Sequence, residues 1–197
     1  MNQKPFMQLA LGNQWDKLPE ALKKHYRNNE AGNNLAVGHL TIDYPAFMQL
    51  PLHLMRLMGA LINRRGENLE TKVARKMDGE RQYWHRTISY PDGKQVHFKS
   101  QFIYQAKTNE LVEYTSRFLG LKMQVHVAND QLYYESCGYV LQLGSIPIHI
   151  PESLALGHAS IIETAVDDDS FDMDFRLKHP LFGQIFSYKG RFKTKQV

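Results

Sequence analysis

Arg86 and Arg75 are the side chains with which this sequence could bind a charged ligand, because both are predicted to point into an apolar interior. Residues 81–104 read as a β-hairpin around Pro91 and Gly93, two residues that suit a tight turn. A guanidinium keeps its charge, and burying it without a partner costs several kcal/mol or more. Alternation along the hairpin places Arg86 on an apolar face, whose other members are Trp84, Ile88, Val96, Phe98 and Phe102.

A carboxylate fits the planar guanidinium best, so an apolar molecule with an acid group is the favoured ligand. Arg86 could instead form an internal ion pair with Glu113 or Glu163, if these acids face inward. Arg75 could extend along its strand to reach solvent, and the large aromatic residues could simply fill the interior. The candidate ligand-binding residues are Thr71, Arg75, Trp84, Arg86, Phe98, Ser100 and Tyr134.

The sequence carries no recognisable catalytic motif. Its nine histidines are scattered without HxH, HxxxH or HExxH spacing, so no metal site is predicted, and no cofactor is expected. If the interior were an active site, a titratable group beside the cavity would be needed, and the candidates are Tyr134, His126 and Glu163.

The composition predicts a single globular domain over residues 1–197. The hydrophobic fraction of 43% and the charged fraction of 22% are ordinary, and the net charge of +4 is spread along the chain, so nucleic-acid binding is not expected. No apolar stretch approaches the roughly 20 residues of a membrane span, and the first apolar run is too short for a signal peptide. With one cysteine and no intramolecular disulfide, a cytoplasmic location is expected. The oligomeric state is not predicted.

Two helices are predicted near the beginning of the chain. Residues 16–27 show helical spacing after Pro19, and residues 35–43 read as a strand. The second predicted helix spans residues 47–64 and is apolar nearly all round, so it is expected to be buried, as a plug in one end of the sheet or as a lid over a cavity. Its most apolar face carries Leu50, Leu54, Leu57, Met58 and Leu61.

The remaining chain reads as strands and turns. Asp78-Gly79 predicts a turn after strand 69–77, with Val73 opposite Trp84 and Arg75 opposite Gln82, while Thr71 lies opposite Arg86. Both turns of this region independently place the same apolar side chains on one face, which supports the sheet.

Two more hairpins follow. Asn129-Asp130 joins strands 119–128 and 131–142 and sets Val125 opposite Tyr134. Residues 167–170 join strands 160–166 and 171–178, which places Ile162 and Val166 on the inner face. The same inner face is expected to carry Phe171, Met173 and Phe175.

A last strand is predicted over residues 183–193, residues 109–117 are read as a strand or a helical turn, and residues 143–156 as a loop with a short helix. About nine to ten antiparallel strands joined by tight turns predict a mostly-β fold. They would form a closed or nearly closed up-and-down barrel, which removes exposed sheet edges.

Several segments resemble a bacterial family described only as a domain of unknown function, number 4166. They are LPEALKKHY, the Trp84-x-Arg86 pair, LYYESCGY and HPLFGQIFSYKGRF. The resemblance implies no activity and no site residues. The predicted order of elements is also similar to that of intracellular lipid-binding proteins, small barrels with capping helices and internal arginines that hold a carboxylate. A shared fold does not by itself fix a function.

Three functions are compatible with the sequence. The favoured one is binding of a hydrophobic or anionic small molecule in a cavity of a few hundred Å³ lined by Arg86. The second is a barrel-cavity enzyme, an isomerase, cyclase or hydrolase acting on an apolar substrate. A cavity lined by a histidine or by a carboxylate of raised pKa would favour it. The third is a filled barrel that acts through its surface as an interaction domain.

Overall fold

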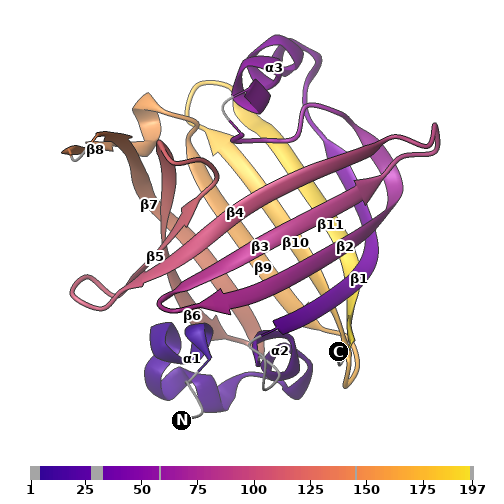
Figure 1. Cartoon of the computed structure of the whole chain (residues 1–197), viewed down its shortest axis with the longest axis vertical. Helices are drawn as coiled ribbons and strands as arrows, with labels where there is room; N and C mark the ends of the chain where they lie inside the picture. Colours follow the sequence, from indigo (N-terminus) through magenta and orange to yellow (C-terminus); the bar gives the residue numbers. More distant parts are fainter. Residues whose placement is uncertain (1–4, 28–32, 58, 145, 196–197) are drawn as a thin grey trace.

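The protein folds into a closed antiparallel β-barrel with helices over both ends (Figure 1). The computed structural model describes residues 5–27, 33–57, 59–144 and 146–195. Ten strands close the barrel in the order β1 to β7, β9, β10, β11 and back to β1, and β8 adds an eleventh strand to the edge of β7. The predicted fold class is therefore confirmed. The strands are β1 (Asn33–Asp43), β2 (Gly66–Asp78), β3 (Arg81–Ser89), β4 (Gln95–Gln105), β5 (Glu110–Tyr114), β6 (Leu119–Ala128), β7 (Gln131–Leu143), β8 (Ile146–Ile150), β9 (His158–Ala165), β10 (Ser170–His179) and β11 (Gly183–Lys195).

The first three helical segments cover one end of the barrel. They are α1 (Phe6–Leu11), the 3₁₀ helix η1 (Gly12–Lys17) and α2 (Glu20–Tyr26). The single helix predicted over 16–27 is thus divided, because Pro19 takes an extended conformation at the N-cap of α2. The helix α1 was not predicted from the sequence.

At the opposite end lie the short 3₁₀ helix η2 (Ala46–Met48) and α3 (Gln49–Leu57), so the helix predicted over 47–64 is much shorter than expected. Its orientation was also predicted wrongly. Leu52 is fully buried, whereas Leu50, Leu54 and Leu57 are exposed; Leu61 lies beyond the helix, and Met58 is outside the described residues. No helix among the described residues is long and apolar enough to cross a membrane.

Two hairpin registers were predicted correctly. In the first, Trp84 pairs with Ser100 and Arg86 with Phe98. In the second, Val125 pairs with Tyr134, across a turn in which both central residues have positive φ. Such a turn matches the twist of the two strands it joins.

The β2–β3 register differs by two residues from the prediction. Asp78 pairs with Arg81, so the turn is Gly79-Glu80, and Arg75 lies opposite Trp84. Because side chains alternate with a period of two, this even shift leaves every predicted face unchanged.

The β9–β10 register differs by an odd number, and it reverses the predicted faces of β9. Ala165 pairs with Phe171, and Val166 N donates a hydrogen bond to Ser170 O, so the loop is one residue longer than predicted. As a result Val166 is exposed, while Ile161 and Glu163 point into the barrel. The extra loop residue is held by Asp167, whose carboxylate accepts hydrogen bonds from the N–H groups of residues 169 and 170.

Of the two alternatives for residues 109–117, the strand is present, as β5 over residues 110–114. The segment 143–156, predicted as a loop with a short helix, contains the short 3₁₀ helix η3 (Glu152–Leu154) but also the unpredicted strand β8 over residues 146–150. Pro147 suits an edge strand because it lacks an N–H group. The barrel closes where its first and last strands, β1 and β11, pair.

Candidate ligand-binding cavity

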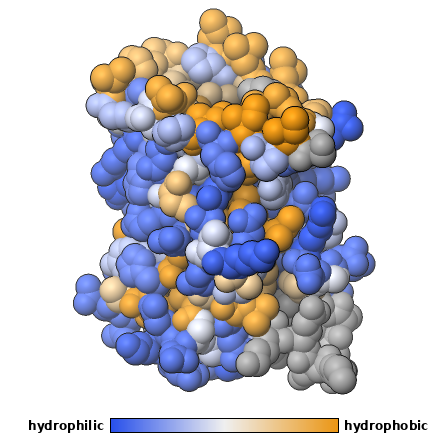
Figure 2. Space-filling view, turned by 90° about the vertical axis from the view of Figure 1, so that its left-hand side faces the viewer, coloured by the Kyte–Doolittle hydropathy of each residue, from blue (hydrophilic) through white to orange (hydrophobic). Residues whose placement is uncertain are grey.

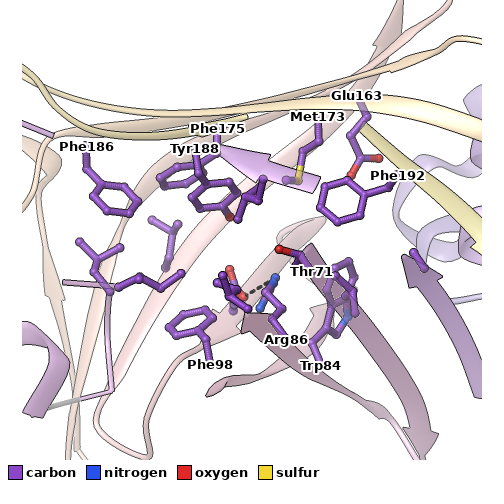
Figure 3. Close-up of a pocket in the computed structure, with 18 of the residues that line it drawn as sticks. Thr71, Trp84, Arg86, Phe98, Glu163, Met173, Phe175, Phe186, Tyr188 and Phe192 are labelled. Carbon is purple, nitrogen blue, oxygen red and sulfur yellow. Dashed lines mark hydrogen bonds and ion pairs between the residues drawn. The ribbon is translucent and has the colours of Figure 1, made fainter. Parts of the chain in front are cut away.

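A partly enclosed cavity lies along the barrel axis between α2 and the segment that follows α3. Its volume is about 80 Å³, smaller than the few hundred Å³ predicted from the sequence. Its wall is largely aromatic and aliphatic and is built from most strands of the barrel (Figure 3). The polar side chains that reach it are His25, Thr71, Arg86, Glu113, Glu163 and Tyr188.

Arg86 reaches the cavity from β3 and is already paired. Its Nη2 lies 3.2 Å from Glu113 Oε1, and its Nη1 donates a 2.9 Å hydrogen bond to Ser100 Oγ. The guanidinium also lies against the rings of Trp84 and Phe98, 4.8 and 5.3 Å from their centroids. The internal ion pair that the sequence left open as an alternative is therefore present.

Glu163 reaches the cavity from β9, on the wall facing Arg86 (Figure 3). It is almost fully buried, and Tyr26 Oη donates a 2.6 Å hydrogen bond to its Oε2. Tyr26 in turn shares a short hydrogen bond with the hydroxyl of Tyr134. Burial raises the pKa of Glu163 to about 7, although Tyr26, Arg75 and Arg86 each act to lower it. The cavity thus contains a carboxyl group that can hold or release a proton near neutral pH.

Arg75 does not reach solvent but is buried at the α2 end. Its Nη2 donates hydrogen bonds to the backbone carbonyl and Nδ1 of His25 and, at 2.6 Å, to Asn34 Oδ1. Its guanidinium stacks near Trp84 and Tyr26, while Nε and Nη1 lack hydrogen-bond partners among the described residues. Burial lowers the pKa of Arg75 to about 10, so it stays charged at neutral pH. Burial, and then the charge of Arg75, hold the pKa of His25 well below its usual value.

The seven residues predicted for the site fall into two groups. Four of them line the cavity: Thr71, Trp84, Arg86 and Phe98. The other three lie behind its wall. Ser100 is hydrogen-bonded to Arg86, Arg75 to His25, and Tyr134 to Tyr26.

The sequence reasoning misplaced one part of the wall and left another unassigned. Glu163 was assigned to the outer face because the loop before β10 was read one residue too short, so it was named only as an alternative partner of Arg86 and as a candidate titratable group. The aromatic side chains of β11 were not assigned, although Phe186, Tyr188 and Phe192 follow the alternation that would have found them. Burial raises the pKa of Tyr188 above its usual range, so it is a neutral hydrogen-bonding group.

A second polar cluster lies on β7 and β9, outside this cavity. His158 Nε2 is 2.6 Å from Glu135 and its Nδ1 is 3.0 Å from Glu152, while Ser136 Oγ donates a short hydrogen bond to Glu152. The two carboxylates raise the pKa of His158 despite partial burial. Ser136 also accepts a hydrogen bond from Ala159 N, so this cluster ties η3 to the barrel. Among the described residues, no group of three or more histidine, cysteine or acidic side chains could hold a metal ion.

The fold and the cavity define a ten-stranded antiparallel barrel protein with a mainly apolar interior cavity. The chain belongs to the family described as Domain of unknown function (DUF4166), whose profile matches residues 18–192. The resemblance stated from the sequence is thereby confirmed.

Comparison with solved structures finds only low similarity. A secretary abundant heat soluble protein from Ramazzottius varieornatus is 14% identical, with a TM-score of 0.36 over 86% of this chain and 97% of that one. A variant of the fluorescent protein UnaG is 11% identical, with a TM-score of 0.33 over 89% and 99%. A putative oleoyl thioesterase from Lactobacillus plantarum is 8% identical, with a TM-score of 0.21 over 84% and 78%. No curated protein matches the chain. Likeness at this level says nothing about ligands.

Proposed function

We propose that the protein binds a small hydrophobic molecule inside the barrel, with the polar end of that molecule beside Arg86. The observation that carries this proposal is the cavity inside the barrel, which combines an aromatic and aliphatic wall with a few convergent polar groups. This is the usual design of a small-molecule site, in which apolar burial supplies affinity and the polar groups fix orientation.

The charges around the cavity favour a ligand that carries one acid group. Arg75 and Arg86 are two fixed cations, whereas Glu113 is one anion and Glu163, with a pKa of about 7, is partly protonated at neutral pH. With Glu163 protonated the interior holds one excess positive charge. A guanidinium has five N–H donors, so Arg86 can bind a ligand carboxylate while keeping its bonds to Glu113 and Ser100.

The volume of the cavity requires some movement of its wall when a longer ligand binds. A second void of about 40 Å³ lies toward the α3 end, and both voids are lined by Ala60, Leu61, Leu121 and Phe175. Leu61 is only partly buried and belongs to no helix or strand. Its displacement would join the two voids and lengthen the site along the barrel axis.

Titration with a matched acid and alcohol tests the proposal. Wild-type protein is expected to bind decanoic acid in a one-to-one complex and more tightly than decanol. Arg86→Leu should lose this preference, whereas Arg81→Leu, an exposed arginine of the same strand, should keep it. Equal binding of the acid by wild type and Arg86→Leu would remove Arg86 from the site. Binding of neither ligand by the wild type would favour a filled barrel that acts through its surface.

Glu163 supports a second candidate, a barrel-cavity enzyme acting on an apolar substrate. A buried carboxyl group with a pKa near 7 is suited to general acid–base catalysis, and it faces the same cavity. Hydrolysis of 4-nitrophenyl decanoate by the wild type, abolished in Glu163→Gln with decanoic acid binding retained, would support the enzyme. Equal rates in both proteins would contradict a catalytic role for Glu163.

A further inference from the structure

The exposed hydrophobic side chains of the barrel gather at the α3 end. Among the described residues, Leu9, Tyr83 and Val166 are the exceptions. Every other large hydrophobic side chain that is exposed belongs to η2 and α3, to the end of β7, to β8 and η3, or to the loops before β6 and β11. Figure 2 shows this concentration over the upper part of the molecule. We call this set the apolar rim: Phe47, Leu50, Leu54, Leu57, Phe118, Leu143, Ile146, Ile148, Leu154, Leu181 and Phe182.

The helix α3 has an unusual orientation within this rim. Leu50, Leu54 and Leu57 follow helical spacing, and such a stripe normally faces the core. Here they are 72%, 58% and 85% exposed, while Leu52 anchors the other side of the helix in the barrel. The apolar rim also joins separate elements, since the rings of Phe47 and Phe182 lie 6.0 Å apart across η2 and the β10–β11 turn.

The charges around the apolar rim are unbalanced toward the positive. Among the described carboxylates of this end, Asp43 and Asp92 each have an arginine within 4 Å and Glu152 lies beside His158, whereas Glu67 has no basic side chain within that distance. The cations Arg56, Arg117 and Lys178 have no carboxylate within that distance among the described residues. Arg117 stacks over the ring of Phe118 at 4.7 Å from its centroid, which joins a cation to the apolar surface.

We propose that the α3 end of the barrel docks on the surface of a lipid bilayer that contains anionic lipids. Leucine and phenylalanine side chains that project from α3 and from the elements and loops beside it suit insertion among fluid acyl chains, and the flanking cations suit anionic headgroups. The proposal does not depend on the cavity. If the cavity does bind an apolar molecule, the void beside Leu61 opens toward this same end, so the ligand would exchange directly with the bilayer.

Sedimentation of the full chain with vesicles tests the docking surface. Wild-type protein is expected to bind vesicles of phosphatidylcholine and phosphatidylglycerol more tightly than vesicles of phosphatidylcholine alone. A variant combining Leu50→Ser, Leu54→Ser and Leu57→Ser should bind at least about tenfold more weakly. A control combining Leu9→Ser and Val166→Ser alters exposed side chains at the other end and should bind as the wild type does.

Two results would overturn the proposal: no vesicle binding by the wild type, or equal vesicle binding by the wild type and the α3 variant. If the wild type does not bind vesicles and instead dimerises through α3, the apolar rim is an interface between two copies of the chain. Titration of the α3 variant with decanoic acid in solution separates this proposal from the function proposed above. Leu50, Leu54 and Leu57 do not line the cavity, so that binding should be unchanged.

Discussion

Arg86 and Glu113 form an ion pair at the wall of the cavity, with 3.2 Å between Nη2 and Oε1 and with only 14% and 11% of their side chains exposed. Because Glu113 already neutralises Arg86, the guanidinium is not an unpaired cation in the ligand-free protein. A ligand carboxylate must share it with Glu113, and the protonation of Glu163 decides how favourable this is.

Removing the charge of Glu113 should strengthen binding of acids. Glu113→Gln leaves Arg86 without its ion-pair partner, so we expect the ratio of affinities for decanoic acid and decanol to rise by about tenfold. The same change should lower the free energy of unfolding by roughly 2–4 kcal/mol, because it breaks a largely buried pair. Calorimetric titration and urea denaturation measure the two effects.

Glu110→Gln is the matched control for this prediction. Glu110 is also on β5 and pairs with Lys122 at 2.9 Å, but neither side chain lines the cavity. Its loss should change stability without changing the acid-to-alcohol ratio. An unchanged ratio in Glu113→Gln would show that Glu113 does not compete for Arg86.

Glu163 should make stability depend on pH in the acid range. The pKa of this group rises from 4.5 to about 7 on folding, so the folded state holds a proton that the unfolded state releases. Stability from this group is therefore complete below pH 4.5, falls as pH rises to about 7, and is constant above that. The total loss is roughly 3 kcal/mol.

Urea denaturation of the wild type and Glu163→Gln between pH 4 and 8, over roughly the range in which the group titrates, measures this dependence. Subtracting the two curves isolates Glu163 from the other titrating groups. The difference should slope between the two pKa values and level off above them. A flat difference would mean that folding does not change the pKa of Glu163.

Leu61 should limit the length of ligand that fits. Leu61→Ala joins the voids of about 80 and 40 Å³, so binding should shift toward longer fatty acids, at a cost of about 1–3 kcal/mol in stability. Leu156→Ala removes a similar volume beside the smaller void alone and should leave chain-length preference unchanged. A series of acids of increasing length, titrated against both variants, compares them. The same preference in both would rule out Leu61 as the barrier.

Gly38 should be essential where the first and last strands meet. A Cβ atom on Gly38 would lie 2.0 Å from Arg191 O, and one on Gly190 would lie 2.1 Å from His39 O, so neither position has room for a side chain. We expect Gly38→Ala to lower the free energy of unfolding by about 2–4 kcal/mol. The control His39→Ala changes an exposed neighbour and should stay within about 0.5 kcal/mol of the wild type. Equal stabilities would mean that β1 and β11 can separate at little cost.

The fold was more predictable than the site because turn residues carry strong local signals. Alternating side chains and the Asn129-Asp130 turn led directly to the strands and the barrel, and even the two-residue error at Gly79 kept the inward faces correct. The prediction of the site depended on whether the β9–β10 loop has an odd or an even number of residues, because this number sets which side chains of β9 point inward. A single additional residue before β10 placed Glu163 inside the barrel, and no local pattern marks that residue.

The orientation of α3 could not be predicted for a different reason. The helix is apolar on two sides, with Leu52 on one and Leu54 and Leu57 on the other. Helical spacing alone therefore does not decide which of these two apolar faces is buried. The hydrogen-bond partners of Arg75 could not be predicted either, because one of them is a backbone carbonyl of α2, which no residue type in the sequence indicates.

Filling the cavity tests the central proposal most directly. Ala36 is fully buried on β1 and lines the cavity, so in Ala36→Leu the larger side chain would occupy the space that a ligand needs. Titration with decanoic acid should show one-to-one binding by the wild type and none by Ala36→Leu, whose thermal unfolding should occur at an unchanged or higher temperature. Equal binding by the two proteins would contradict a ligand site inside the barrel.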